Sequence, residues 1–107
     1  MCYDLILAIV NRGFSDLVMD AARAAGAKGG TILHARGTGV HEAAQFFGIS
    51  IQPEKEIVMI LIGRAERDSV MRQICEHAGL NTEGRGMVFS LPVDEVAGIV
   101  HMMKGGN

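Results

Sequence analysis

Four short runs of apolar, β-forming residues are spaced along the chain. Tyr3–Val10 and Ile57–Ile62 are apolar at nearly every position, which predicts strands that are buried on both faces. Thr31–Ala35 and Met87–Leu91 are shorter runs, and each follows a stretch that contains glycine. We therefore expect four strands and burial on both faces of the first and the third.

Two segments have the period of amphipathic helices. In Phe14–Ala25 apolar residues recur at i, i+3, i+4 and i+7, with Ser15 as the expected N-cap and Gly26 as the expected C-cap. A second helix is expected to begin near Arg64 and to end at Gly79. Its apolar stripe consists of Val70, Met71, Ile74, Cys75 and Ala78.

The order of these elements is strand, helix, strand in each half of the chain. This predicts an α+β fold of ferredoxin-like type, a β-α-β-β-α-β sandwich in which an antiparallel four-stranded sheet carries two helices on one face. Pro92–Glu95 is expected to form a short helical turn after the last strand. Because two helices cover only one face of the sheet, we expect the other apolar face to pack against further copies of the chain in a closed homo-oligomer.

The composition limits the classes of function. The 107 residues fit one domain, residues 1–107, and 49% hydrophobic against 21% charged residues is typical of a globular protein. Ten Lys and Arg against twelve Asp and Glu argue against a nucleic-acid partner. The longest apolar run, Leu5–Val10, is too short for membrane insertion, and two cysteines without a signal peptide indicate the cytoplasm.

The sequence shows no clear catalytic site and only weak evidence for a metal site. No nucleophile is arranged with a base, so we predict no catalytic residue and no enzyme activity. His34 and His41 flank a glycine loop and leave open a metal site at a subunit boundary, although this spacing alone is weak evidence. Asn11 and Arg12 are the only support for a small enzyme on this fold, such as an acylphosphatase, whose glycine-rich phosphate loop the chain lacks.

Two glycine loops are the more informative candidates for a ligand site. Gly37-Thr38-Gly39 follows the second predicted strand, and Gly84-Arg85-Gly86 precedes the fourth. Glycines let the backbone approach a ligand closely and present N–H groups to an anion, but they also form ordinary turns. Both loops flank the same layer of the predicted fold, so together they can form one cleft.

The segments around these loops resemble a known family. Gly29–Gly39 resembles the second strand and the start of the T-loop of PII nitrogen-regulatory signalling proteins. Glu83–Phe89 and Leu91–Val96 resemble their B-loop, fourth strand and C-terminal region. The resemblance implies a ferredoxin-like homotrimer with ligand clefts between subunits. It places the T-loop at about 37–54, the B-loop at about 80–86 and the C-terminal segment at 92–107.

The resemblance carries over to the ligand site only in part. The positions that shape the adenine-nucleotide site of PII proteins are matched by Thr31, Gly37, Gly39, Gly84 and Gly86. The cations that hold the phosphates are replaced by Val40, Met87, Gly98 and Val100. His41 replaces the glutamine that binds the metal, and Glu54 replaces the lysine that meets 2-oxoglutarate. We therefore do not expect Mg-ATP and 2-oxoglutarate to bind in the usual way.

The effector is left open, with an adenine nucleotide that carries fewer phosphates as one candidate. Replacement charge is available from Arg36, Arg85, His101 or Lys104. The candidate ligand-binding residues are Thr31, Arg36, Gly37, Thr38, Gly39, Gly84, Arg85 and Gly86.

The expected T-loop is short and apolar, and it contains no tyrosine. Phe46 and Phe47 either pack on the edge of the sheet or extend a strand, or they form a docking site for a partner protein. The resemblance implies a signalling protein that senses a small effector and regulates an enzyme or transporter, in nitrogen or related metabolism. The alternative is a trimeric metal-binding protein similar to the CutA proteins, which would use His34 and His41.

Overall fold

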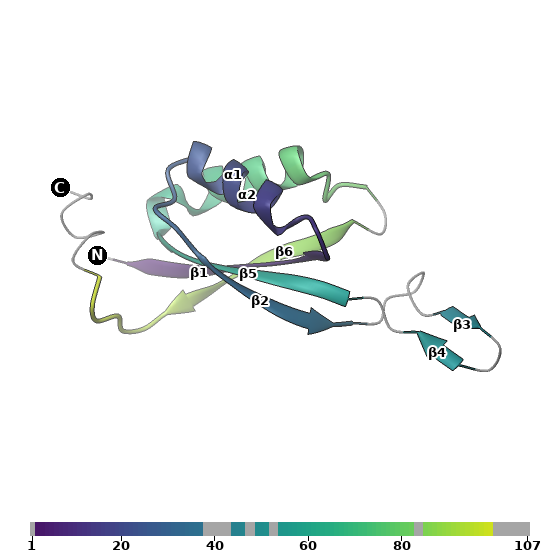
Figure 1. The fold of residues 1–107 in the computed structure, drawn as a ribbon. Helices are drawn as coiled ribbons and strands as arrows, with labels where there is room; N and C mark the ends of the chain where they lie inside the picture. The colour runs from purple at the N-terminus through teal and green to yellow at the C-terminus, as the bar shows by residue number, and fades with distance from the viewer. Residues whose placement is uncertain (1, 38–43, 47–48, 52–53, 83–84, 100–107) are drawn as a thin grey trace.

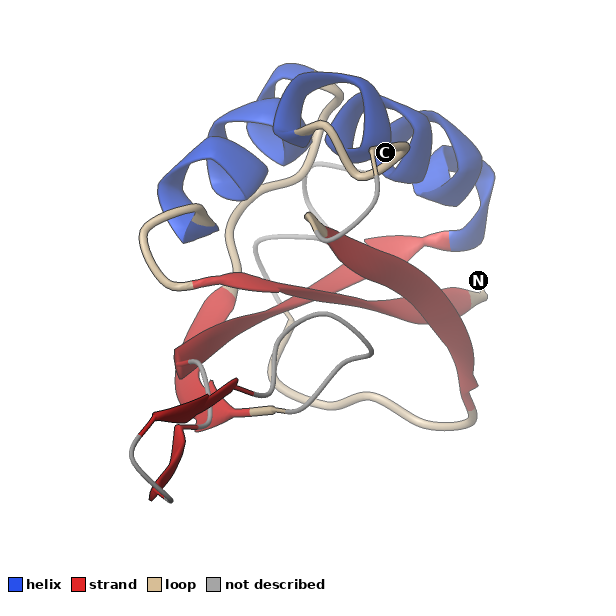
Figure 2. Ribbon diagram, turned by 90° about the vertical axis from the view of Figure 1, so that its right-hand side faces the viewer, coloured by secondary structure: helices blue, strands red, loops and turns tan. Residues whose placement is uncertain are grey.

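A four-stranded antiparallel sheet with both helices on one of its faces forms the body of the protein (Figure 1, Figure 2). The computed structural model describes residues 2–37, 44–46, 49–51, 54–82 and 85–99. The strand order is β2-β5-β1-β6, and the ferredoxin-like prediction is confirmed. The elements are β1 (Tyr3–Asn11), α1 (Ser15–Ala24), β2 (Thr31–Arg36), β3 (Ala44–Phe46), β4 (Ile49–Ile51), β5 (Glu54–Gly63), α2 (Arg64–Ala78) and β6 (Gly86–Val93).

The core lies between the helices and the face of the sheet that they cover. Alternate residues of β1 and β5 point into it, as expected for strands with one face against helices. Small residues on α1 let that helix approach the sheet closely. The buried set is Ile6, Ala8, Val10, Val18, Met19, Ala21, Ala22, Ala27, Val58, Ile60, Ile62, Val70, Ile74 and Ala78. No helix in the described part of the chain has the length and apolar character that a membrane crossing requires.

The opposite face of the sheet is apolar and carries no helix. The strand register aligns three rows across it. Leu5 lies between Leu61 and Leu91, Leu7 lies between Met59 and Phe89, and Ile9 lies between Ile57 and Met87. On this face Met87 is 57% exposed and Leu91 is 47% exposed. The apolar residues of this open face are adjacent to one another, whereas those of an ordinary surface are scattered singly. The apolar runs in the sequence predict such a face.

The C-cap of α1 is Ala25, so the predicted C-cap Gly26 lies one residue later, with a φ of +112°. Two further local predictions are wrong. Ser15 is the first residue of α1, and Phe14 occupies the N-cap position without a side-chain cap bond. The expected helical turn at Pro92–Glu95 is absent, because β6 continues through Val93 and pairs Pro92 with Asp4 of β1. Since β6 is an edge strand, the missing N–H of proline is tolerated there.

A small hairpin lies between β2 and β5 in the sequence. Strands β3 and β4 pair only with each other, with Phe46 opposite Ile49, and form a sheet apart from the body (Figure 1). Phe46 therefore lies in a strand, as the last residue of β3, and that strand belongs to the hairpin and not to the four-stranded sheet. Phe47 lies outside the described residues.

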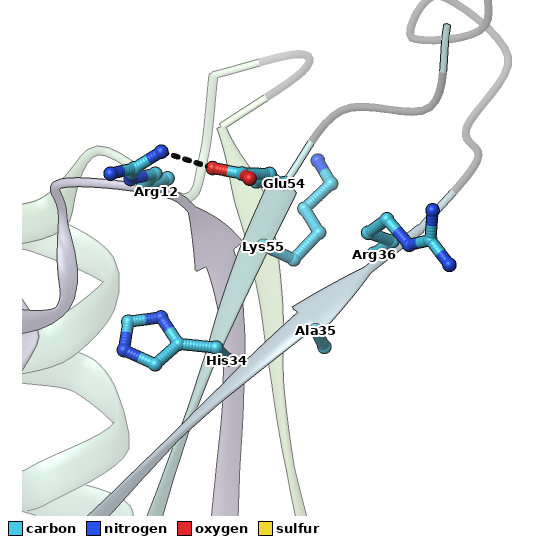
Figure 3. Close-up of a pocket in the computed structure, with 6 residues that line it drawn as sticks. All are labelled: Arg12, His34, Ala35, Arg36, Glu54 and Lys55. Atoms are coloured by element: carbon cyan, nitrogen blue, oxygen red, sulfur yellow. Dashed lines mark hydrogen bonds and ion pairs between the residues drawn. The ribbon is translucent and has the colours of Figure 1, made fainter.

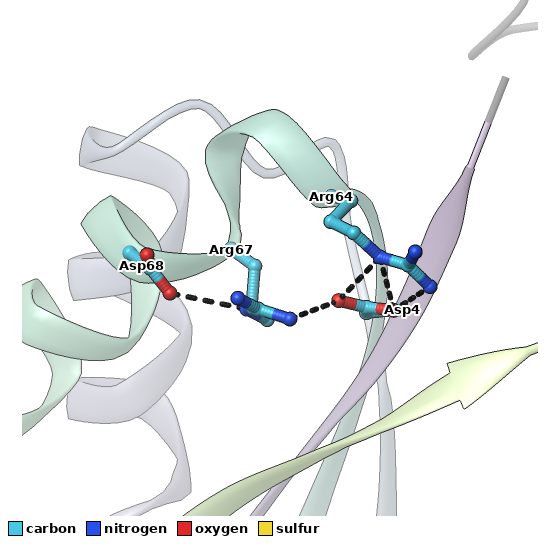
Figure 4. A network of polar contacts seen from close by, with 4 residues as sticks. All are labelled: Asp4, Arg64, Arg67 and Asp68. Atoms are coloured by element: carbon cyan, nitrogen blue, oxygen red, sulfur yellow. Dashed lines mark hydrogen bonds and ion pairs between the residues drawn. The ribbon is translucent and has the colours of Figure 1, made fainter.

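A buried carboxylate ties the start of β1 to the start of α2 (Figure 4). Asp4 is 1% exposed and accepts hydrogen bonds from Nε and Nη2 of Arg64 and from Nη1 of Arg67, at 2.7 to 3.3 Å. Nε of Arg67 also donates to the exposed Asp68 at 3.1 Å. The hydrogen bonds from Arg64 above all, helped by those from Arg67, lower the pKa of Asp4 below its ordinary value against the opposing effect of burial.

Candidate functional site

Both candidate glycine loops adjoin the same end of the four-stranded sheet. The register pairs Arg36 with Glu54 and Asn11 with Lys55, and it pairs Val10 with Gly86. The end of β2, the start of β5, the end of β1 and the start of β6 therefore lie side by side at this end. However, β2 and β6 are the two outer strands, so three strand spacings, about 14 Å, separate the two glycine loops of one chain.

A hollow of about 370 Å³ opens where β2 and β5 meet (Figure 3). Three of its six lining residues are cations, Arg12, Arg36 and Lys55, and they come from β1, β2 and β5 or the turns beside them. Glu54 supplies the one carboxylate among the six lining residues, and His34 and Ala35 complete the lining.

Arg12 and Glu54 form an ion pair at the rim of the hollow (Figure 3). The backbone N–H of Arg12 also donates to the carbonyl oxygen of Glu54 at 3.2 Å, so the two residues are held together independently of their side chains. The side chains are 69% and 56% exposed, which makes the ion pair a weak contribution to stability.

Lys55 is a nearly buried cation, 7% exposed, on the wall of the hollow. Its Nζ donates to Oδ1 of Asn11 at 2.6 Å, and burial lowers the pKa of its ammonium group. Its aliphatic stem passes close to Gly37, where an added Cβ would lie 3.3 Å from Cγ of Lys55. Gly37 therefore lies against the stem of Lys55 at the edge of the hollow.

Glu56 connects this end of the sheet to α1. Its Oε1 accepts the backbone N–H of Gly13 at 2.8 Å and that of Ser15 at 3.4 Å, so it supplies the negative charge that helix N-termini favour. These contacts, the one from Gly13 first, lower the pKa of Glu56 although burial opposes this. Nδ1 of the exposed His34 lies 3.9 Å from Oε2 of Glu56.

Arg85 turns toward the helices. Its guanidinium carbon lies 4.6 Å from the centroid of the Phe14 ring, a cation–π contact. The same group lies beside Gly79 at the end of α2, where an added Cβ would be 3.6 Å from it. In this conformation Arg85 fixes the loop before β6 against the helical layer, so the charge that the sequence offers for a ligand is engaged with an aromatic ring.

The remaining predicted site residues are dispersed. Thr31 begins β2 and is exposed opposite Met59, five residues and about 17 Å along the strand from Arg36. Gly86 begins β6 with a φ of +134° and packs against the backbone of β1. Thr38, Gly39 and Gly84 lie outside the described residues.

The metal-site alternative gains no support from the described residues. Among them, no three His, Cys, Asp or Glu side chains are grouped to hold a metal ion. His34 lies in the lining of the hollow, and His41 lies outside the described part of the chain.

Arg36 is the one lining residue of the hollow that is also a ligand residue predicted from the sequence. The prediction misses the other two cations of the hollow, Arg12 and Lys55, as well as His34, Ala35 and Glu54. Arg12 and Lys55 reach the site because β1 pairs with β5 over its full length. A partial signal exists in the sequence, since Arg12 ends an apolar strand and Lys55 begins another, and strand ends meet at the edges of a sheet.

Comparison with known proteins agrees with the fold and with the family resemblance of the sequence. A family model for the nitrogen regulatory protein P-II matches residues 3–101. The chain belongs to the P-II family. The crystal structure of Arabidopsis thaliana PII bound to citrate is similar to this P-II protein with a TM-score of 0.66 and 26% sequence identity. The match covers 91% of this chain and 80% of that one. A sequence search of curated proteins gave no match.

Proposed function

We propose that this P-II protein is a cytoplasmic signalling protein, and not an enzyme, that senses a small anionic effector and regulates a partner protein. The observation that carries the proposal is the cationic hollow of Arg12, Arg36 and Lys55 at the root of the segment that bears β3 and β4. That segment is the T-loop, about 37–54, and Phe46 and Phe47 in it contact an enzyme or transporter. The pathway is nitrogen or related metabolism.

The open face supports a homotrimer. Its rows of Leu, Ile, Met and Phe side chains cover β1, β5 and β6, and both helices lie on the opposite face of the sheet (Figure 2). An apolar surface of this kind is stable when further copies of the chain cover it. Three sheets that face a common axis bury it on every subunit.

The positions of the glycine loops support clefts between subunits. The Arg36–Gly37 loop lies at one outer strand and the Arg85–Gly86 loop at the other. A single cleft that uses both loops must join the β2 edge of one copy to the β6 edge of the next. Such a head-to-tail contact closes into a ring, whereas a two-fold dimer would bring like edges together. The hollow is then the part of the cleft that one chain supplies.

The chemistry of the site favours a small anion over a nucleoside triphosphate. The similar PII structure is described as bound to citrate, which is a small tricarboxylate. Met87 and Gly98 carry no charge, and Met87 lies on the open face of β6, so these positions add no cation for phosphates. An adenine nucleotide with fewer phosphates remains within the proposal, and Mg-ATP with 2-oxoglutarate is not part of it.

The wild-type chain is expected to form a trimer, and Leu7→Asp is expected to dissociate it. Leu7 lies at the centre of the open face between Met59 and Phe89, so a carboxylate there would be buried without a partner. Size-exclusion chromatography with light scattering measures the mass. Leu17→Asp is the matched control, because Leu17 is 38% exposed on α1. A monomeric wild type, or equal dissociation of both variants, would contradict the trimer.

The effector proposal predicts saturable binding of a small anion. Citrate, AMP, ADP and 2-oxoglutarate are titrated into the wild-type protein by calorimetry at constant ionic strength, and at least one is expected to bind about one equivalent per chain. Arg36→Gln is expected to weaken that binding about tenfold, because a charge-assisted hydrogen bond is lost. Absence of binding by every compound, with no change in Tm, would reject the effector role.

A further inference from the structure

The hollow contains its own carboxylate. Glu54 is the only acidic residue among the six that line it, and it forms the ion pair with Arg12. A guanidinium fork binds a ligand carboxylate or phosphate with the same geometry that it uses for a side-chain carboxylate. Glu54 therefore occupies a place on Arg12 that an anionic ligand would take.

The other two cations are placed differently. Within the described residues the side chain of Arg36 forms no hydrogen bond or ion pair, while its backbone lies opposite Glu54 in the pairing of β2 with β5. The Lys55 ammonium is anchored on the amide oxygen of Asn11, which fixes its position. Figure 3 shows Lys55 between Glu54 and Arg36. A ligand in the hollow thus meets three cations in different states. Arg36 has no side-chain ion pair, Lys55 is held in place by Asn11, and Arg12 is already paired with Glu54.

The Arg12–Glu54 ion pair is weak, yet it re-forms readily. Both side chains are more than half exposed, so water and salt screen their attraction. The backbone hydrogen bond from Arg12 to Glu54 keeps the carboxylate next to the guanidinium, which gives it a high effective concentration there. An external anion must therefore compete for Arg12 with the Glu54 carboxylate, which the backbone hydrogen bond holds nearby.

We propose that Glu54 is a built-in competitor for the effector: a small anion with two or more negative charges binds Arg36, Lys55 and Arg12 and displaces the Glu54 carboxylate from Arg12. This inference rests on the proposed effector site and names the chemistry of its ligand. Carboxylates and phosphates share that chemistry. No nucleoside and no metal ion is required, and all the residues belong to one chain.

The test is a double-mutant cycle on anion affinity. Citrate and pyrophosphate are titrated by calorimetry at constant ionic strength into the wild type, Glu54→Gln, Arg12→Gln and the double variant. Glu54→Gln is expected to tighten binding two- to fivefold, because a weak exposed ion pair no longer competes. In the Arg12→Gln background the same substitution is expected to change affinity by less than about 1.5-fold, because the competition is over Arg12.

This cycle separates displacement from simple repulsion. If Glu54 only repelled the ligand through space, Glu54→Gln would tighten binding to the same extent with or without Arg12. That result would overturn the inference, as would unchanged or weaker binding by Glu54→Gln alone. If citrate binds the wild type more tightly than pyrophosphate does, the effector is a carboxylate; the opposite order indicates a phosphorylated effector. Either order is compatible with displacement of Glu54.

Controls keep this test distinct from that of the proposed function. Arg72→Gln removes an exposed arginine of α2 outside the hollow and is expected to leave affinity within about twofold of the wild type. Failure of every variant, Glu54→Gln included, to bind any anion would reject the effector site itself. Binding by the wild type without the expected dependence on Arg12 would reject only the role of Glu54.

Discussion

Replacing Gly86 with alanine is expected to lower the free energy of unfolding by about 3 kcal/mol or more. Gly86 has a φ of +134°, which residues with a Cβ rarely adopt. An added Cβ would also overlap the carbonyl oxygen of Ile9 and lie 3.2 Å from Cα of Val10. Both obstacles are backbone atoms of β1, so β6 would have to move away from the sheet.

A series of glycines separates the two causes. Gly13 has a φ of +97° but open space around its Cβ position, so Gly13→Ala is expected to cost only the conformational strain, about 1–2 kcal/mol. Gly29 has open space and no such φ, and Gly29→Ala is expected to remain within about 1 kcal/mol of the wild type, or to stabilise. Urea denaturation gives the three values. A cost at Gly86 no larger than that at Gly13 would contradict the steric argument.

Replacing Asp4 with asparagine is expected to lower Tm by at least about 10 °C at pH 7. Asp4 is the carboxylate that joins Arg64 and Arg67 at the start of α2, and its side chain is 2% exposed. Asparagine has a similar shape but cannot neutralise two guanidinium groups, so the ion pairs between β1 and α2 would be lost, and the backbone hydrogen bond from Arg64 to Cys2 would remain. Thermal unfolding followed by circular dichroism measures the change.

The effect of Asp4 depends on pH in a definite direction. Its pKa is lowered in the folded protein, so its ionised form stabilises the fold above the ordinary pKa of 3.8. This stabilisation is lost as the pH falls through the lower pKa of the folded state. The difference in Tm between wild type and Asp4→Asn should therefore be constant above about pH 5 and shrink in more acidic buffer. Asp68→Asn is the control, because Asp68 is 79% exposed and its loss should matter little.

The parts of the fold that the sequence predicts are those with strong local patterns. The apolar runs of β1 and β5 and the helical period of α1 have a physical cause within ten or so residues of chain, namely burial on the core side. The wrong predictions have causes far away in sequence. Glu56, 41 residues from Ser15, takes the place of the N-cap side chain, and pairing with Asp4 keeps Pro92 in a strand.

The candidate site was predictable to a smaller extent, for the same reason. Arg36 belongs to the hollow and Gly37 to its edge. The sequence offers Arg36 as replacement charge for a ligand, and Gly37 matches a site position of the PII segments. Arg12 and Lys55 enter through the register of β1 and β5, which no local pattern encodes. Strands β3 and β4 have three residues each, too few for a period of two to stand out.

The positions of the two glycine loops at opposite edges of the sheet have a genetic consequence. In the proposed ring of three, each cleft would take one loop from each of two neighbouring chains. If the proposed cleft uses both loops, a subunit damaged only in its Arg36–Gly37 loop and a subunit damaged only in its Arg85–Gly86 loop are each expected to be inactive as pure rings. When they are co-expressed, every mixed ring contains one junction at which two undamaged loops meet. Paired loss-of-function alleles of this protein should therefore complement each other, which a site built within a single chain could not do.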